Sequence, residues 1–187
     1  MSTGTIVAII IAVVVVIAVV AFALSKTRRS RTLRTKFGPE YDHTVSSAGD
    51  SRRAEELLER RQQRVEKYHL RPLRPEEVQR FSREWRDVQA RFVDDPRGAV
   101  ADADRLVADA MTARGYRIPD IETRIEDLSV EHPHEVTHFR SAHEIALRAA
   151  NGSAGTEDLR QAMQHYRSIF EILLDSRVNV VHEEVRR

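Results

Sequence analysis

The amino-acid sequence predicts an all-α protein, in which one N-terminal transmembrane helix precedes an antiparallel bundle of about five to six helices. Three observations lead to this fold class. Residues 6–24 form an uninterrupted apolar run. Beyond residue 50, apolar side chains recur at spacings of three and four, as they do on a helix that buries one face. No segment alternates apolar and polar residues over a useful length, so we expect no sheet.

The apolar run is predicted to span a bilayer. From Ile6 to Leu24 every residue is Ile, Val, Ala, Phe or Leu. At ~1.5 Å per residue the run gives about 28 Å of helix, close to the roughly 30 Å thickness of the hydrocarbon layer. A cleaved signal peptide is the alternative, because residues 21–23 read Ala-Phe-Ala. However, residues 1–5 contain no Lys or Arg and the run is longer than a signal-peptide core, so a retained anchor is predicted.

A cluster of cations, which we call the basic collar, follows the predicted span. It consists of Lys26, Arg28, Arg29, Arg31, Arg34 and Lys36, with no acidic residue among them. Cationic side chains beside a span stay on the cytoplasmic side. The collar therefore predicts a single-pass cell-membrane protein with residues 1–5 outside the cell and the residues after the span in the cytoplasm. The collar serves topology and interfacial anchoring in the simpler interpretation, and contact with anionic lipid headgroups in the alternative one.

Charge and composition argue against several functions. Without the collar, the chain holds 24 basic and 29 acidic side chains. Such an acidic body argues against general binding of nucleic acid, which requires cations over the folded surface. The sequence contains no cysteine, which excludes disulfides, thiolate zinc sites and cysteine nucleophiles.

Composition also divides the chain after the span. Residues 25–49 are predicted to be a linker, because they are rich in Ser, Thr and Arg and because Gly38-Pro39 breaks a helix. Residues 50–176 are predicted to form the helical domain, and residues 177–187 a C-terminal tail. Within the domain, the first helix is expected at about residues 50–69.

The second helix, expected from Pro75, has the clearest pattern. Its apolar seam continues for four turns through Val78, Phe81, Trp85, Val88 and Phe92. Asp95 is expected to cap the third helix, with Pro96 at its first position and Gly115 just after its end. Three further helices are expected at 119–128, from 133 to before 152, and from a cap at Thr156 onward.

Three stretches carry a resemblance to a known group of proteins. They read RTKFGPEYD at 34–42, QARFVDDP at 89–96, and TEDLRQAM at 156–163 followed by His165-Tyr166-Arg167. In these stretches the chain resembles small single-pass membrane-anchored proteins of actinobacteria that have an FGPEYD motif beside the membrane and a helical domain. The resemblance covers most of the chain and implies architecture and lineage. It implies no catalytic residue.

The FGPEYD motif itself is a candidate site. Phe37, Gly38, Pro39, Glu40, Tyr41 and Asp42 place two aromatic rings, a Gly-Pro turn and two acids just beyond the collar. An unstructured spacer would need none of these. Two interpretations remain open: the segment docks on the helical bundle, or it is an epitope for a protein partner.

A second motif suggests metal chemistry. His134, Glu135 and His138 match H-E-x-x-H, in which two histidines one helical turn apart bind zinc and the glutamate activates water. Pro133 would place His134 in the mobile first turn of a helix, and no third ligand has a suitable spacing. A zinc-dependent hydrolase is therefore the alternative function, and exposed histidines are the preferred interpretation.

The favoured function is a non-enzymatic interaction or scaffold domain tethered to the membrane. The sequence has no glycine-rich phosphate loop and no catalytic triad, so no catalytic residue, metal or cofactor is assigned. Membrane lipids and an unidentified protein are the expected partners.

Overall fold

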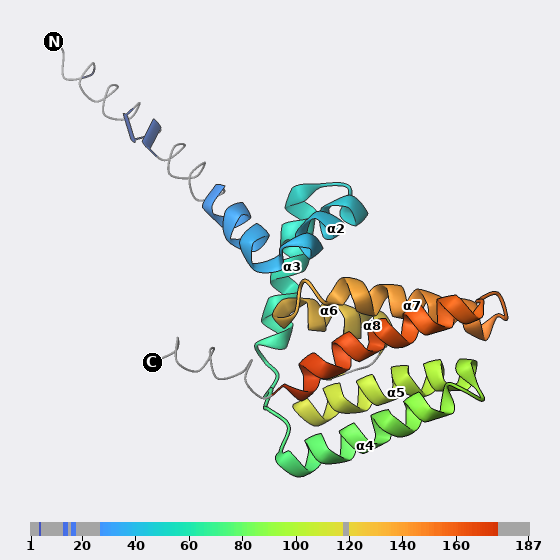
Figure 1. Cartoon of the computed structure of the whole chain (residues 1–187). Helices are drawn as coiled ribbons and strands as arrows, with labels where there is room; N and C mark the ends of the chain where they lie inside the picture. The colour runs from blue at the N-terminus through green and yellow to red at the C-terminus, as the bar shows by residue number, and fades with distance from the viewer. Residues whose placement is uncertain (1–3, 5–12, 15, 18–26, 118–119, 176–187) are drawn as a thin grey trace. The chain divides into compact units, whose positions relative to one another are not determined.

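A computed structural model describes residues 4, 13–14, 16–17, 27–117 and 120–175 (Figure 1). These residues contain helices and no strands, so the all-α prediction is confirmed for this part of the chain. The chain forms two compact units, which we call the N-terminal unit (Met1–Leu58) and the C-terminal unit (Glu59–Arg187). The boundary falls inside a helix, whereas the sequence predicted a domain boundary at residue 50.

The prediction of a linker at residues 25–49 is wrong for most of that range. Residues 27–37 are helical, and α2 follows at Pro39–Ala48. Gly38 has a φ of 46°, which lets the chain turn between the two helices. Pro39 then occupies the first position of α2, where its missing N–H costs no hydrogen bond, so this proline starts a helix instead of preventing one.

Helix α3 (Ser51–Val65) links the two units and ends about a turn before the predicted position. Helix α4 (Pro75–Arg91) begins at the predicted proline, and Phe81 and Trp85 of its seam are buried. Helix α5 (Pro96–Arg114) begins as expected, because the Asp95 side chain accepts a hydrogen bond from the Gly98 N–H.

The remaining helices are α6 (Ile121–Glu131), α7 (Val136–Ala150) and α8 (Thr156–Leu174). All three starting positions differ from the prediction, and α6 begins at Ile121 instead of residue 119. Residues 133–135 form a turn, so α7 begins after His134. Thr156 is the first residue of α8 and not its cap; the Asp158 carboxylate accepts a hydrogen bond from the Gly155 N–H at 3.0 Å instead.

In the C-terminal unit, α4 packs on α5, α5 packs on α8, and α7 packs on α8 (Figure 1). Aromatic side chains fill the core between these helices. The Trp85 ring lies 4.9 Å from the Phe170 ring in a stacked arrangement, and Phe139 meets Tyr166 edge to face. Arg114 is fully buried and donates a hydrogen bond to the Leu173 carbonyl at 3.1 Å, where the negative end of the α8 dipole favours a cation.

Among the described residues, no helix combines the length and apolar character needed to cross a membrane. The predicted span, Ile6–Leu24, lies outside these residues except at four positions. Val13, Val14, Val16 and Ile17 are helical, and their side chains are exposed.

Candidate functional site

The basic collar belongs to the helix at residues 27–37, apart from Lys26, which lies outside the described residues. One stripe of this helix faces inward, with Leu33 and Phe37 buried and Ser30 half-buried. The collar cations occupy the rest of the surface and are exposed: Arg28, Arg29, Arg31, Arg34 and Lys36. The helix is therefore amphipathic, with a narrow inner face and a broad cationic outer face.

Two cations of the collar, Arg34 and Lys36, form contacts inside the N-terminal unit. The Arg34 guanidinium forms an ion pair with Asp42 at 2.8 Å and lies 5.6 Å from the centre of the Tyr41 ring. The Lys36 ammonium lies 5.9 Å from the centre of the Phe37 ring. These two cations help to order the FGPEYD motif.

The FGPEYD motif forms the turn between residues 27–37 and α2, and much of it is interior. Phe37, Glu40 and Tyr41 are buried, while Pro39 and Asp42 are exposed. The Tyr41 hydroxyl donates a hydrogen bond to the Glu55 carboxylate at 3.0 Å. Burial, followed by this hydrogen bond, raises the pKa of Tyr41 above its usual value. The motif thus contributes packing contacts within its own unit.

Glu55 connects the three helices that residues 27–58 of the N-terminal unit contribute to: residues 27–37, α2 and α3. It lies on α3 with 5% of its surface exposed, and the same carboxylate oxygen accepts hydrogen bonds from Ser30 and Tyr41. Sequence reasoning did not identify Glu55, because it lies in a charge-rich helix beside other acids. The position of Glu55 directly after Ala54, which is buried, was the available signal that this glutamate could also face the interior.

A second polar cluster lies in the C-terminal unit, between the end of α3 and α6. Asp127 is buried, and its carboxylate accepts hydrogen bonds from Arg64 and from the Tyr68 hydroxyl, each at 2.7 Å. Arg64 also pairs with Glu126 at 2.8 Å. Burial is the main cause that raises the pKa of Asp127. Burial, followed by the hydrogen bond to Asp127, raises the pKa of Tyr68 to about 12. Each polar group has a partner, as expected of a structural anchor for α3.

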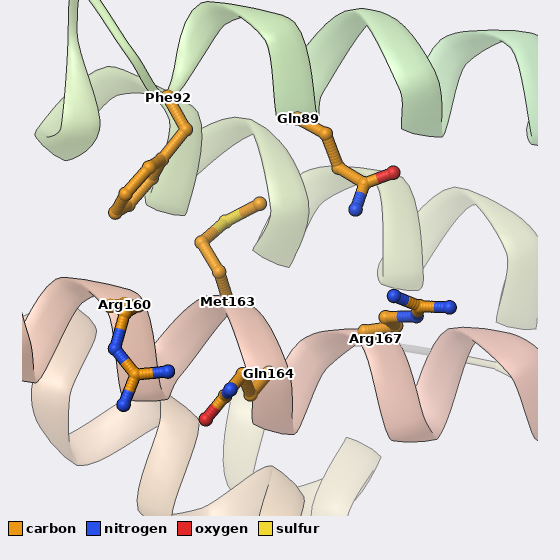
Figure 2. Close-up of a pocket in the computed structure, with 6 residues that line it drawn as sticks. All are labelled: Gln89, Phe92, Arg160, Met163, Gln164 and Arg167. Carbon is orange, nitrogen blue, oxygen red and sulfur yellow. The ribbon is translucent and has the colours of Figure 1, made fainter.

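The surface between α4 and α8 contains a hollow of about 170 Å³, which we call the α4–α8 hollow (Figure 2). Phe92 and Met163 supply its apolar part, and the polar lining comes from four residues without an acid among them: Gln89, Arg160, Gln164 and Arg167. Each arginine is held by an acid of its own helix, Arg160 by Glu157 and Arg167 by Glu171. An apolar centre with a polar rim is suited to contact with a partner.

The structure separates the residues of the H-E-x-x-H motif. His134 is exposed in the turn before α7, and Glu135 occupies the N-cap position of that helix without a side-chain capping hydrogen bond. The two histidines are therefore not one turn apart on a helix. His138 instead faces His165 of α8, with 3.1 Å between their Nδ1 atoms. Within the part of the chain that the structure describes, no three His, Asp or Glu side chains are grouped to hold a metal ion.

Comparisons with protein-family models, curated proteins and solved structures found no match for this chain.

Proposed function

We propose that this protein is a membrane-tethered, non-enzymatic interaction domain. Residues 6–24 serve as its anchor, the N-terminus lies outside, and the two helical units lie on the cytoplasmic face of the cell membrane. The main support for an anchor is that four apolar residues of this segment are helical and exposed, with 50–62% of each residue accessible: Val13, Val14, Val16 and Ile17. Exposed apolar side chains on a helix are unfavourable in water and favourable in lipid, where a helix also satisfies its own backbone groups.

The basic collar supports the proposed orientation. Its described cations are all exposed, and they begin only a few residues after Leu24. Each cation close to an anionic membrane surface contributes about 1 kcal/mol of attraction, which decays within a Debye length. The helix at residues 27–37 would therefore lie near lipid headgroups while its inner stripe packs against α2 and α3.

The α4–α8 hollow is the proposed contact surface for a protein partner. The supporting features are its apolar centre, its two arginines and its position on a face of the C-terminal unit. A partner that inserts an apolar side chain at Met163 and presents polar groups to the rim would match this chemistry. The resemblance to actinobacterial membrane-anchored proteins agrees with the same tethered architecture.

Membrane extraction tests the proposal. The intact chain should stay with the membrane pellet after an alkaline wash, because an apolar span is held by lipid and not by charge. A variant with Val13, Val14, Val16 and Ile17 replaced by Ser should be released. A matched variant in which Arg28, Arg29 and Arg31 become Gln should remain in the pellet. Release of the parent by the wash would contradict an anchor in the bilayer.

A further inference from the structure

His138 and His165 are brought together from two different helices. His138 is exposed on α7, and His165 is half-buried on α8. Their Nδ1 atoms are 3.1 Å apart, and their ring planes are within 24° of parallel. We propose that the two imidazoles share one proton and hold α7 against α8 at neutral pH, and that acid weakens this contact.

The ring geometry favours a hydrogen bond. The ring centres are 5.1 Å apart while the nitrogens are 3.1 Å apart, so the rings meet edge to edge through Nδ1 and do not overlap face to face. Edge-to-edge rings aim the N–H of one imidazole at the lone pair of the other. A chelated metal ion would require the two lone pairs to converge on a third point.

This contact depends on the protonation state. Two neutral rings form it when one of them has the tautomer with Nδ1 protonated, and a pair with one added proton forms a charge-assisted version. When both rings are protonated, both Nδ1 atoms are donors, and two N–H groups and two positive charges face each other. The doubly protonated pair therefore loses the hydrogen bond and gains repulsion.

The neighbouring charged groups do not neutralise a second proton. On the α7 side, His134 and Glu135 lie in the preceding turn, and Arg148 pairs with Asp158 of α8 at 3.2 Å. From α5 and α6, Asp104 and Arg124 pair with each other at 3.1 Å. In the described ranges, neither imidazole forms an ion pair with a carboxylate.

The direction of the pH effect follows from linkage. Burial, and then the charge of His138, lowers the pKa of His165 from its ordinary value of 6.5. Folded His165 then binds fewer protons than His165 does in the unfolded chain. Stability contributed by the pair is present above pH ~6.5 and is lost as the pH falls below that value.

Thermal unfolding of the full chain in detergent micelles, followed by circular dichroism at about pH 7.5 and about pH 5, tests the proposal. The acid-induced decrease in melting temperature should be about 2–4 °C smaller in His138→Gln and in His165→Gln than in the parent. The double variant should show no further reduction, because either change removes the same contact. His69→Gln is the matched control, because His69 is an exposed histidine of the loop after α3, and it should behave like the parent.

A second measurement uses only the parent chain, so it gives a result even if a variant fails to fold. Nitrogen chemical shifts of the imidazoles in the parent should show the pair losing its two protons in separated steps, the lower one below pH ~6.5. Independent titration of both rings near their ordinary pKa would overturn the proposal. So would added zinc that raises the melting temperature of the parent but of neither variant, because that result would mean a chelating pair.

Discussion

The two units of this protein differ in what fills their interiors. In the described part of the N-terminal unit, three of the eight buried residues are polar or charged: Glu40, Thr44 and Glu55. In the described part of the C-terminal unit, only four of thirty-two are: Arg114, Asp127, Ser129 and His132. Hydrogen bonds from Ser30 and Tyr41 to Glu55 therefore carry more of the organisation of the first unit, and aromatic packing more of the second.

This difference shows why one unit is easier to predict than the other. A core built from apolar side chains leaves a period of three and four in the sequence, whereas a small interior that depends on a buried glutamate leaves no such period. A segment of this length also buries little apolar surface, so polar contacts take a larger share of its stability. Substitutions in the two units should therefore change the free energy of unfolding by different amounts.

The largest effect is expected at the apolar core. Trp85 is 7% exposed and stacks on Phe170. Trp85→Ala should lower the free energy of unfolding by about 3–5 kcal/mol, because it removes buried surface and leaves a cavity. Chemical denaturation followed by circular dichroism measures this change. Val93→Ala, at a side chain 82% exposed, should cost less than about 0.5 kcal/mol. A loss at Trp85 as small as at Val93 would show that the α4 seam does not face a core.

A smaller and more local effect is expected at the polar interior of the N-terminal unit. Glu55→Ala leaves the Ser30 and Tyr41 hydroxyls without their acceptor and should cost about 1–3 kcal/mol. Hydrogen exchange of the intact chain should show faster exchange in residues 27–58 and unchanged exchange in α4, α5 and α8. Tyr41→Phe is the milder control, since Glu55 keeps the Ser30 contact. Unchanged exchange in residues 27–58 of the Glu55 variant would mean that this carboxylate does not organise the unit.

A still smaller effect is expected when one hydrogen bond is removed from the anchor between α3 and α6. Tyr68→Phe removes one of the two hydrogen bonds to Asp127 at 2.7 Å and should cost about 0.5–1.5 kcal/mol in chemical denaturation. Arg64→Gln should cost more, because it takes the cation away from a buried carboxylate. The reverse order of the two variants would show that the hydroxyl, and not the guanidinium, is the main partner of Asp127.

No effect is expected from metal removal. If His134 and His138 held zinc, a chelator would lower the melting temperature, because a ligand bound only to the native state stabilises it. The purified chain should instead contain no stoichiometric zinc, and its melting temperature should be the same with and without chelator. One zinc ion per chain that is lost in a His134→Ala, His138→Ala variant would restore the hydrolase interpretation.

The sequence predicted the helices of the C-terminal unit well, but in both units it predicted poorly the polar side chains that connect one helix to another. The α4 seam, the Asp95 cap and the end of α5 at Gly115 follow from periodicity and local capping rules, which need no tertiary information. His165 and Glu55 were missed because their partners are 27 and 14 or more residues away in the chain. Gly38-Pro39 was interpreted as a helix breaker within a linker, whereas in the structure Pro39 is the first residue of α2.

Cysteine labelling in intact cells tests the central claim, the tethered orientation, most directly. The sequence has no cysteine, so each introduced thiol reports on one position. Ser2→Cys lies before the proposed span, and Gln63→Cys lies on α3 at an exposed position. A membrane-impermeant maleimide should label the Ser2 variant in intact cells and the Gln63 variant only after the membrane is permeabilised. Labelling of the Gln63 variant in intact cells, with the Ser2 variant protected, would contradict the proposed orientation.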